Sequence, residues 1–295
     1  MALFKGSGVA IVTPFKDDKV DFNKLEELLN WHVENGTAAI IICGTTGEAS
    51  TMSEAERKET IKFTVDVINK RIPVIAGTGT NDTAKSVSMS VWAESIGVDG
   101  LLVITPYYNK TTQKGIYEHF KAINDKVNTP IVVYNVPGRT GLNITPKTLL
   151  KLSELKNVTA IKEASGNISQ IAEMMSLCRG KIDLYSGNDD QIIPLISLGG
   201  LGVISVVANL YPKEISSICD LYFNGHQDEA LKLQLDMLPV INAMFIEVNP
   251  IPIKTAMNFS GMNVGPLRLP LCEMEEGNLK TLKDIVEKFN SFKGE

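Results

Sequence analysis

The segment Val158–Gly166 (VTAIKEASG) places Lys162 at the end of a short apolar run that predicts a buried strand. Alternate side chains of a strand share one face, so we expect Lys162 to point the same way as Val158 and Ala160. An amine on such a face loses hydration, its pKa falls, and the free amine can attack a carbonyl carbon. The alternative is a lysine that reaches from the strand end into solvent, which is the commoner arrangement.

Three other predicted strand ends carry groups that could assist such an amine. In Gly44–Glu48 (GTTGE), two hydroxyls and backbone N–H groups could close around a carboxylate or phosphate. In Tyr134–Gly141 (YNVPGRTG), Tyr134 should point into the core, and Arg139 could bind a carboxylate with two parallel hydrogen bonds. Thr105–Asn109 (TPYYN) offers two adjacent tyrosines. Each has a plainer interpretation: a Gly/Thr loop, a surface arginine, and tyrosines that only pack.

Several other chemistries do not fit the sequence. The three histidines (His32, His119 and His226) fall in predicted helical stretches and at none of the candidate strand ends. This disfavours a Ser-His-Asp or Cys-His arrangement and a zinc-dependent aldolase. No HExxH, P-loop or EF-hand motif is present. A lysine nucleophile, hydroxyls for proton transfer and an arginine remain, a set that suits covalent chemistry on a keto acid without a metal or other cofactor.

Short apolar runs alternate with longer amphipathic ones along most of the chain. The predicted strands are Gly8–Thr13, Ala38–Cys43, Pro73–Gly77, Gly100–Thr105, Pro130–Asn135, Val158–Lys162, Asp183–Ser186 and Gly202–Val207. Eight strand–helix units with continuously apolar strands predict an α/β fold, a (β/α)8 TIM barrel. The competing arrangement is an open doubly wound sheet. It calls for GxGxxG after an early strand, and Gly77–Thr80 (GTGT) lacks the third glycine.

Helix start signals support this division of the chain. Ser53 with Glu56 forms a capping box, and Thr145 precedes a proline at the first helical position. Further predicted starts are Asn167 with Gln170, Asp189, and Pro212. Helical patterns without strand candidates follow, so we expect a catalytic barrel over residues 1–224 and a C-terminal helical domain over 225–295.

Bulk properties restrict the partners. A net charge of −5, a pI near 5.4 and the lack of a basic stripe argue against nucleic acid. No apolar run is long enough to span a membrane, and the first residues show no signal-peptide core. The four cysteines are widely spaced, which favours a reducing cytoplasm.

Taken together, the motifs resemble the dihydrodipicolinate synthase family, within the pyruvate-dependent class I aldolases that include N-acetylneuraminate lyase. The resemblance covers essentially the whole chain. It rests on GTTGE at Gly44–Glu48, TPYYN at Thr105–Asn109, YNVPGRTG at Tyr134–Gly141, IKEASG at Ile161–Gly166, GVISV at Gly202–Val206 and NPIPIK at Asn249–Lys254. Such a combination is highly specific, and it favours the nucleophilic interpretation of the buried lysine.

The resemblance implies a role for each matching residue. Lys162 corresponds to the lysine that forms a Schiff base with pyruvate. Tyr134 corresponds to the tyrosine that transfers protons, with Thr46 and Tyr108 as its relay partners. The remaining substrate residues are Thr45 and Thr46 for the pyruvate carboxylate, Arg139 for the carboxylate of L-aspartate 4-semialdehyde, and Gly187 and Ile204 for backbone contacts to pyruvate. The implied reaction gives 4-hydroxy-tetrahydrodipicolinate, which leads to diaminopimelate and lysine.

Arg139 distinguishes this interpretation from its nearest rival. Sialic acid lyases share the lysine, the tyrosine and a similar threonine loop, but they generally lack the GRT turn. A second rival, a barrel that binds keto acids for regulation without turnover, would have no need to combine Lys162, Tyr134 and Thr46. In the family, the second relay tyrosine comes from a neighbouring subunit, so the resemblance also implies a homo-oligomer, most often a dimer of dimers.

The resemblance further implies a regulatory cleft for L-lysine, and here the chain departs from part of the family. The matching positions are Ala49, Glu54, Arg57, Asn81, Lys85 and Tyr107. In the well-known bacterial pattern, histidines occupy the positions of Glu54 and Arg57, and a glutamate occupies that of Lys85. We therefore expect a degenerate cleft and no appreciable inhibition by L-lysine.

Overall fold

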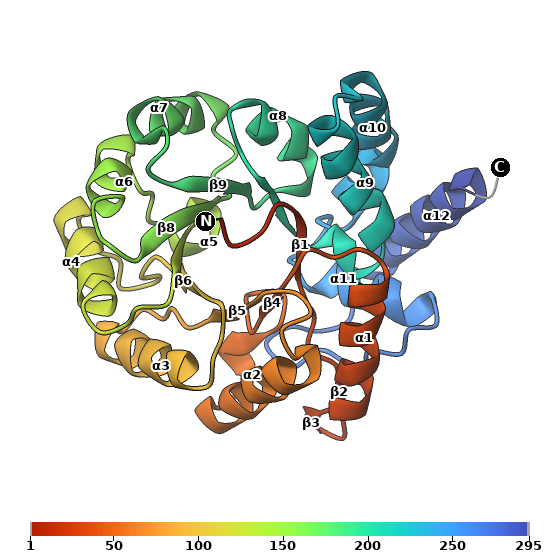
Figure 1. Cartoon of the computed structure of the whole chain (residues 1–295). Coiled ribbons are helices and arrows are strands. Elements are labelled where there is room, and N and C mark those ends of the chain that lie inside the picture. The colour runs from red at the N-terminus through yellow and green to blue at the C-terminus, as the bar shows by residue number, and fades with distance from the viewer. Residues whose placement is uncertain (1, 294–295) are drawn as a thin grey trace.

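Eight of the apolar runs form parallel strands that close into a barrel in the computed structural model, which describes residues 2–293 (Figure 1). The strands are β1 (Gly6–Ala10), β4 (Ala39–Ile42), β5 (Val74–Gly77), β6 (Gly100–Ile104), β7 (Ile131–Asn135), β8 (Val158–Glu163), β9 (Asp183–Ser186) and β10 (Gly202–Ser205). Their order around the barrel is β1-β10-β9-β8-β7-β6-β5-β4. The predicted (β/α)8 barrel is confirmed, with small differences at the strand ends.

Helices surround the barrel, and several of them begin at the capping residues that the sequence predicts. They are α1 (Phe22–Glu34), α2 (Glu54–Ile68), α3 (Thr83–Ser95), α4 (Gln113–Asn124), α5 (Pro137–Thr140), α6 (Pro146–Leu152), α7 (Ile168–Cys178), α8 (Ile192–Ser197) and α9 (Pro212–Phe223). Ser53 accepts from the N–H of Glu56 and completes the predicted capping box of α2. Thr145 and Asn167 cap α6 and α7 as predicted. Three short 3-10 helices also occur: η1 (Ala49–Thr51), η2 (Asp189–Gln191) and η3 (Val207–Asn209).

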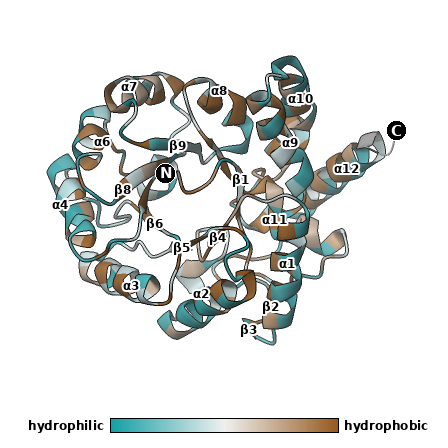
Figure 2. Cartoon of the chain, in the orientation of Figure 1, coloured by the Kyte–Doolittle hydropathy of each residue, from teal (hydrophilic) through white to brown (hydrophobic). Residues whose placement is uncertain are grey.

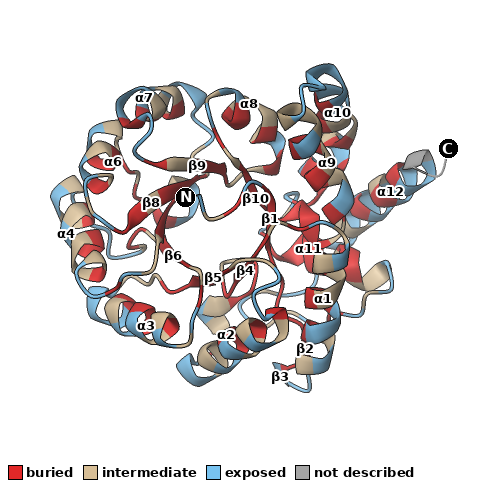
Figure 3. Cartoon of the chain, viewed as in Figure 1, coloured by how far each residue is buried: buried red, intermediate tan, exposed pale blue. Residues whose placement is uncertain are grey.

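Two apolar layers form the core. An inner cluster fills the barrel and includes Ile41, Val132, Tyr185 and Ile204, while an outer cluster lies between the strands and the helices. Figure 2 shows the apolar strands at the centre and polar stretches on the outer helices, and Figure 3 shows the same strands buried. Parallel strands covered on both faces require continuous apolar runs, which explains the pattern in the sequence.

The N-terminal segment closes the amino end of the barrel. The rings of Phe4 and Tyr185 stack with centroids 4.3 Å apart. The Tyr185 hydroxyl donates to the carbonyl of Phe4 at 2.6 Å and accepts from its N–H at 3.3 Å. A site inside the barrel therefore opens only at the carboxyl ends of the strands, where catalytic groups of this fold lie.

A glycine pair joins the first strand to the last. Gly6 of β1 pairs with Gly202 of β10, and Gly202 has a φ of +145°. A Cβ at Gly202 would lie 1.9 Å from the carbonyl oxygen of Gly6, so no other residue fits without separating the two strands.

One local expectation was wrong. The register between β7 and β8 shifts, with Ile131 opposite Val158 but Val132 opposite Ala160, so one residue of β8 bulges. The bulge changes the alternation of side chains. Val158 therefore packs in the outer cluster, whereas Ala160 belongs to the inner one, as expected. Asp189 begins η2, as predicted, and its carboxylate bonds to the end of β10.

Helices without strands follow residue 224 in the part of the chain that the structure describes: α10 (Gln227–Ala243), α11 (Ile251–Phe259) and α12 (Glu276–Lys293). They lie on one side of the barrel, next to α1 and α9 (Figure 1). The division into domains 1–224 and 225–295 stays a prediction. Between residues 2 and 293, no helix is long and apolar enough to cross a membrane.

A short antiparallel hairpin, β2 (Phe15–Lys16) with β3 (Lys19–Val20), follows β1 and was not predicted. Two-residue strands are too short to show the alternation of apolar and polar residues by which a strand is predicted. The hairpin places Phe15 beneath the C-terminal segment, where its N–H donates to the carbonyl of Val264 at 3.2 Å.

Candidate active site

A cavity of about 180 Å³ lies at the carboxyl ends of the barrel strands. Six of the predicted site residues line it: Thr45, Thr46, Tyr134, Arg139, Lys162 and Gly187. They come from the ends of β4, β7, β8 and β9 and from the loops and short helix after them. Elements far apart in the sequence thus bring one amine, three hydroxyls and one guanidinium around a space of small-metabolite size.

Lys162 is the chemical centre of this cavity. Its side chain points into the barrel, it is 5% exposed, and its Nζ lies 4.4 Å from the centroid of the Tyr134 ring. No hydrogen bond joins Nζ to any other residue within 2–293. Desolvation lowers the pKa of Lys162 to about 8; Asp189 opposes this shift and Arg139 adds to it. A substantial fraction of the amine is therefore neutral near pH 8 and can act as a nucleophile.

Tyr134 is the neighbouring acid–base group. Residues Tyr134 and Lys162 stand opposite each other in the register of β7 and β8, and both side chains face the interior. Burial raises the pKa of Tyr134 to about 12, and a hydrogen bond with Thr45 partly offsets this effect. A neutral tyrosine with a hydroxyl neighbour can donate a proton and take it back.

Thr45 and Thr46 lie in a tight turn after β4. The turn is closed by the N–H of Glu48, which donates to the carbonyl of Thr45 at 3.1 Å. Thr46 is buried, and its Oγ1 accepts from Nδ2 of Asn249 at 3.0 Å. This bond leaves the hydroxyl proton of Thr46 free to donate, which suits a proton relay or an anionic ligand.

Arg139 lies at the mouth of the cavity, in α5. Its residue is exposed, and Nη2 donates to the carbonyl of Asn249 at 2.9 Å. A planar guanidinium held on one side keeps its remaining N–H groups for a ligand carboxylate. Gly187 lies against the lysine: a Cβ there would approach Cε of Lys162 to 3.0 Å. The missing side chain makes room for the amine and its adduct.

Two of the predicted residues are not part of the cavity lining. Ile204 is fully buried in the inner cluster, and Val206 lines the cavity instead. Tyr108 is 89% exposed, has a φ of +66°, and does not line the cavity of its own chain. A left-handed φ is uncommon for a bulky aromatic residue.

The residues of the expected regulatory cleft are only partly assembled. Ala49, Arg57 and Tyr107 line a second cavity of about 210 Å³ that adjoins the first at Thr45 and Tyr134. Nη2 of Arg57 donates to the carbonyl of Gly77 at 2.9 Å. The other three members lie outside this lining: Glu54 pairs with Lys58 at 2.6 Å, Asn81 accepts from Asn109, and Lys85 lies in the first turn of α3. A cation therefore lines the cavity, and no carboxylate does.

Four residues near the site had no role in the sequence interpretation: Glu48, Asp189, Asn249 and Lys254. Buried Asp189 accepts from the Ser205 hydroxyl and from the N–H of Val206 at 3.0 Å, which fixes the end of β10. Asn249 and Lys254 lie in the NPIPIK motif and Glu48 in GTTGE, so a signal existed in the sequence. Their partners lie about 200 residues away, and only the structure shows them.

The arrangement as a whole fits imine chemistry on a small keto acid. The amine of Lys162 can attack the carbonyl, Tyr134 can transfer the protons, and the Thr45–Thr46 turn can bind the carboxylate. Within the described residues, no three or more His, Cys, Asp or Glu side chains gather in a way that could hold a metal ion.

Comparisons with known proteins agree with this geometry. The model of the dihydrodipicolinate synthetase family matches residues 3–289. A 4-hydroxy-tetrahydrodipicolinate synthase of Clostridium novyi is 77% identical over 98% of each chain. Among solved structures, the dihydrodipicolinate synthase of Thermotoga maritima shares 43% identity with a TM-score of 0.95, over 98% of this chain and 99% of that one. The chloride-inhibited dihydrodipicolinate synthase of Acinetobacter baumannii, solved with pyruvate, shares 41% identity with a TM-score of 0.94, over 97% of this chain and 99% of that one.

Schiff-base formation should depend on pH in a predictable direction. Since the pKa of Lys162 is lowered to about 8, the amine is mostly protonated below that pH and cannot attack. We expect kcat/KM for the keto acid to rise with pH up to about 8 and then to level off, because this parameter reports the free enzyme. Asp189→Asn removes a charge that raises this pKa and should move the rise to lower pH. A rise centred near 10.5, the ordinary value, would contradict the desolvated amine.

Proposed function

Because the chain belongs to the dihydrodipicolinate synthetase family, we propose that its central cavity condenses pyruvate with L-aspartate 4-semialdehyde through a Schiff base on Lys162. The product is 4-hydroxy-tetrahydrodipicolinate, in the first step that commits these substrates to diaminopimelate and lysine. The observation that carries the proposal is the buried Lys162 amine, which has no hydrogen-bond partner in residues 2–293 and lies over Tyr134.

The proposed first half-reaction uses Lys162 of β8, Tyr134 of β7 and the Thr45–Thr46 turn. The neutral amine of Lys162 attacks the ketone carbon of pyruvate, and the carbinolamine loses water after Tyr134 transfers a proton to its oxygen. The hydroxyl of Thr46, free to donate, continues the relay, and Thr45 with the turn N–H groups binds the carboxylate. Gly187 borders the cavity beside Lys162, and the backbone of Ile204, one layer below the lining, is the other proposed contact to the pyruvate pocket. The protonated imine is itself the electron sink, so the reaction needs no cofactor.

The second half-reaction joins the two substrates. Loss of a methyl proton from the imine gives an enamine, whose carbon attacks the aldehyde of the semialdehyde. Arg139 is placed at the cavity mouth, where its guanidinium can bind the carboxylate of this second substrate in two parallel hydrogen bonds. The substrate amine then displaces Lys162 from the imine carbon, which closes the ring and frees the enzyme.

Reduction with borohydride in the presence of pyruvate should inactivate the enzyme and leave a reduced adduct on Lys162. Peptide mapping by mass spectrometry locates the adduct. Lys162→Ala should lower kcat on the order of 10³-fold or more, because the covalent route is lost. Lys114→Ala, which changes an exposed lysine on α4, is the control and should be trapped normally. An adduct on another lysine, or none with pyruvate, would disprove the proposed mechanism.

Arg139→Ala should impair the use of L-aspartate 4-semialdehyde far more than that of pyruvate. Loss of a charge-assisted, two-point contact costs roughly 2–4 kcal/mol, or on the order of 30- to 1000-fold in kcat/KM. Steady-state kinetics with each substrate varied in turn measures the effect. Arg179→Ala, at the far end of α7, should change neither value. If the wild type cleaves N-acetylneuraminate faster than it condenses L-aspartate 4-semialdehyde with pyruvate, the chain acts as a sialic acid lyase instead.

We propose that the chain assembles as a homotetramer, a dimer of dimers, in which Tyr108 completes the proton relay of a neighbouring subunit. Its 89% exposure and its absence from the lining of its own cavity support this role. Dilution to monomer should abolish activity while the barrel stays folded, as sedimentation with a coupled assay can show. Tyr108→Phe should slow turnover without dissociating the oligomer. Tyr117→Phe, the control, should leave turnover unchanged. A fully active monomer would refute the shared site.

We further propose that the regulatory cleft does not respond to L-lysine. A ligand ammonium would find the cation Arg57 in the cavity lining, and Lys85 at the position where the family pattern has a carboxylate. Loss of one charge-assisted hydrogen bond costs about 1.5–3 kcal/mol and like-charge repulsion adds about 1 kcal/mol. Binding should therefore weaken on the order of 30- to 1000-fold. A titration of initial rates should give no appreciable inhibition at millimolar lysine. Half-inhibition below about 1 mM would show that another group, such as Glu54, replaces the carboxylate.

The cytoplasm is the proposed location. All four cysteines are free, and Cys272 is exposed. An exposed thiol without a disulfide partner suits a reducing compartment.

A further inference from the structure

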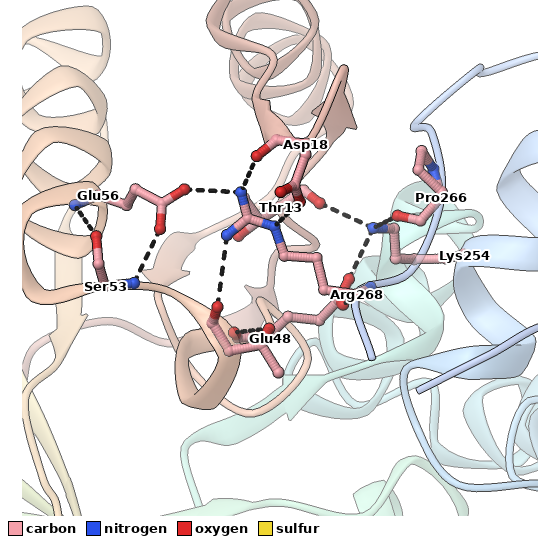
Figure 4. Close-up of polar contacts among 9 residues, drawn as sticks. Thr13, Asp18, Glu48, Ser53, Glu56, Lys254, Pro266 and Arg268 are labelled. Atoms are coloured by element: carbon pink, nitrogen blue, oxygen red, sulfur yellow. Dashed lines mark hydrogen bonds and ion pairs between the residues drawn. The ribbon is translucent and has the colours of Figure 1, made fainter. Parts of the chain in front are cut away.

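A buried ion pair lies directly behind the Thr45–Glu48 turn, and the proposed mechanism does not use it. Nζ of Lys254, on α11, is 2.7 Å from Oε1 of Glu48, and the two side chains are 1% and 0% exposed. The ammonium also donates to the carbonyl of Thr13 at 3.1 Å and to that of Pro266 at 2.7 Å (Figure 4). All three donors of Lys254 are thus used.

The second oxygen of Glu48 is occupied as well. Oε2 accepts from the backbone N–H of Arg268 at 3.0 Å. The guanidinium of Arg268 pairs with Glu56 of α2 at 2.7 Å and lies 4.2 Å from the centroid of the Phe15 ring. Figure 4 shows Lys254 and Arg268 converging on Glu48 from the C-terminal segment. The Glu48 carboxylate is therefore held at both oxygens by residues about 200 positions away.

These contacts act on the backbone that carries the two threonines. Glu48 is the last residue of the turn and has a left-handed φ of +53°, and its N–H closes the turn onto Thr45. The Thr13 hydroxyl holds the carbonyl of Gly47 at 2.7 Å, and Asn249 holds Thr46 from the side. A strained residue keeps its conformation only where its surroundings fix it. The surroundings here are Lys254 and its neighbours.

The need for stability alone does not explain an ion pair at this place. Replacing a buried ion pair by apolar side chains is often neutral or stabilising, because the charges lose their hydration. An apolar side chain at position 48, however, could accept no hydrogen bond and would be held less specifically. Lys254 at Oε1 and the N–H of Arg268 at Oε2 together fix the orientation of the Glu48 carboxylate.

We propose that Lys254 and Glu48 are positioning residues for the reaction: they hold the Thr45–Thr46 turn in the conformation that binds the carboxylate of the keto acid. The proposal rests on the proposed function of the turn. It predicts that loss of the pair weakens recognition of the carboxylate and leaves attack on a carbonyl by Lys162 intact.

Borohydride trapping with two ketones separates these effects. Pyruvate carries the carboxylate, and acetone offers a similar carbonyl without one. In Glu48→Gln, the pyruvate concentration for half-maximal trapping should rise about tenfold or more, and KM for pyruvate should rise likewise. Tenfold corresponds to about 1.4 kcal/mol. The dependence of trapping on acetone should stay within about twofold of the wild type. An equal loss for both ketones would indicate a general loosening of the barrel and would overturn the proposal.

The double variant Glu48→Gln/Lys254→Met guards against misfolding, because it leaves no unpaired charge. It should melt at a higher temperature than Glu48→Gln, which keeps the unpaired Lys254 charge, and still show the raised requirement for pyruvate. A wild-type requirement in this variant would mean that the ion pair serves only stability.

Glu56→Gln is the matched control. It alters the same group of charges one step farther from the turn, and glutamine can keep the capping box of α2. It should leave both ketone dependences unchanged; a pyruvate-specific rise here would overturn the assignment to Glu48 and Lys254. Absence of wild-type trapping on Lys162 would disprove the proposed function itself, whereas trapping with unchanged pyruvate dependence in Glu48→Gln would disprove only the positioning role.

Discussion

The structure depends on keeping one amine dry and without hydrogen-bond acceptors. Lys162 can be a nucleophile near neutral pH only because the barrel removes water from it. The inner cluster fills the barrel below it, and Phe4 with Tyr185 closes the amino end. Above it, the loops after the strands leave a cavity of about 180 Å³. Together these features limit the ligand to a small molecule that enters from the carboxyl end of the barrel.

A second buried lysine shows how strongly the surroundings decide the chemistry. Lys254 is as deeply buried as Lys162, yet three oxygen atoms accept hydrogen bonds from its ammonium and Phe15 lies 4.6 Å away. Burial lowers the pKa of Lys254 as well, but the Glu48 carboxylate opposes this shift, and the three acceptors engage all of its N–H groups. Lys162 lacks such acceptors and faces a ring at 4.4 Å. The same side chain thus serves as a fixed charge in one place and as a nucleophile in the other.

The sequence was sufficient for the barrel and for six of the eight predicted catalytic and substrate-binding residues, which line the cavity, because continuous apolar strands and strand-end motifs are local signals. It failed where distant parts of the chain interact. The bulge in β8 moved Val158 to the outer cluster, since its cause lies in the pairing with β7. The start of η2 at Asp189 was predicted, but the bond of its carboxylate across to β10 was not. The partners of Glu48 are also beyond the reach of any local pattern, because Lys254 and Arg268 follow it by about 200 residues.

The pairing of β1 with β10 also has a consequence for biosynthesis. The first strand can pair early with β4 on one side, but it finds its second partner only when the last strand, Gly202–Ser205, has left the ribosome. At 5–20 residues per second, roughly 10–40 s pass between the two events. During that time one edge of β1 exposes unpaired backbone groups, which can pair with other chains. Long-range closure of this kind also slows folding, because the loop must close before the contacts form. The nascent chain is therefore most prone to aggregate before its last barrel strand emerges, and chaperones that shield strand edges would act in that interval.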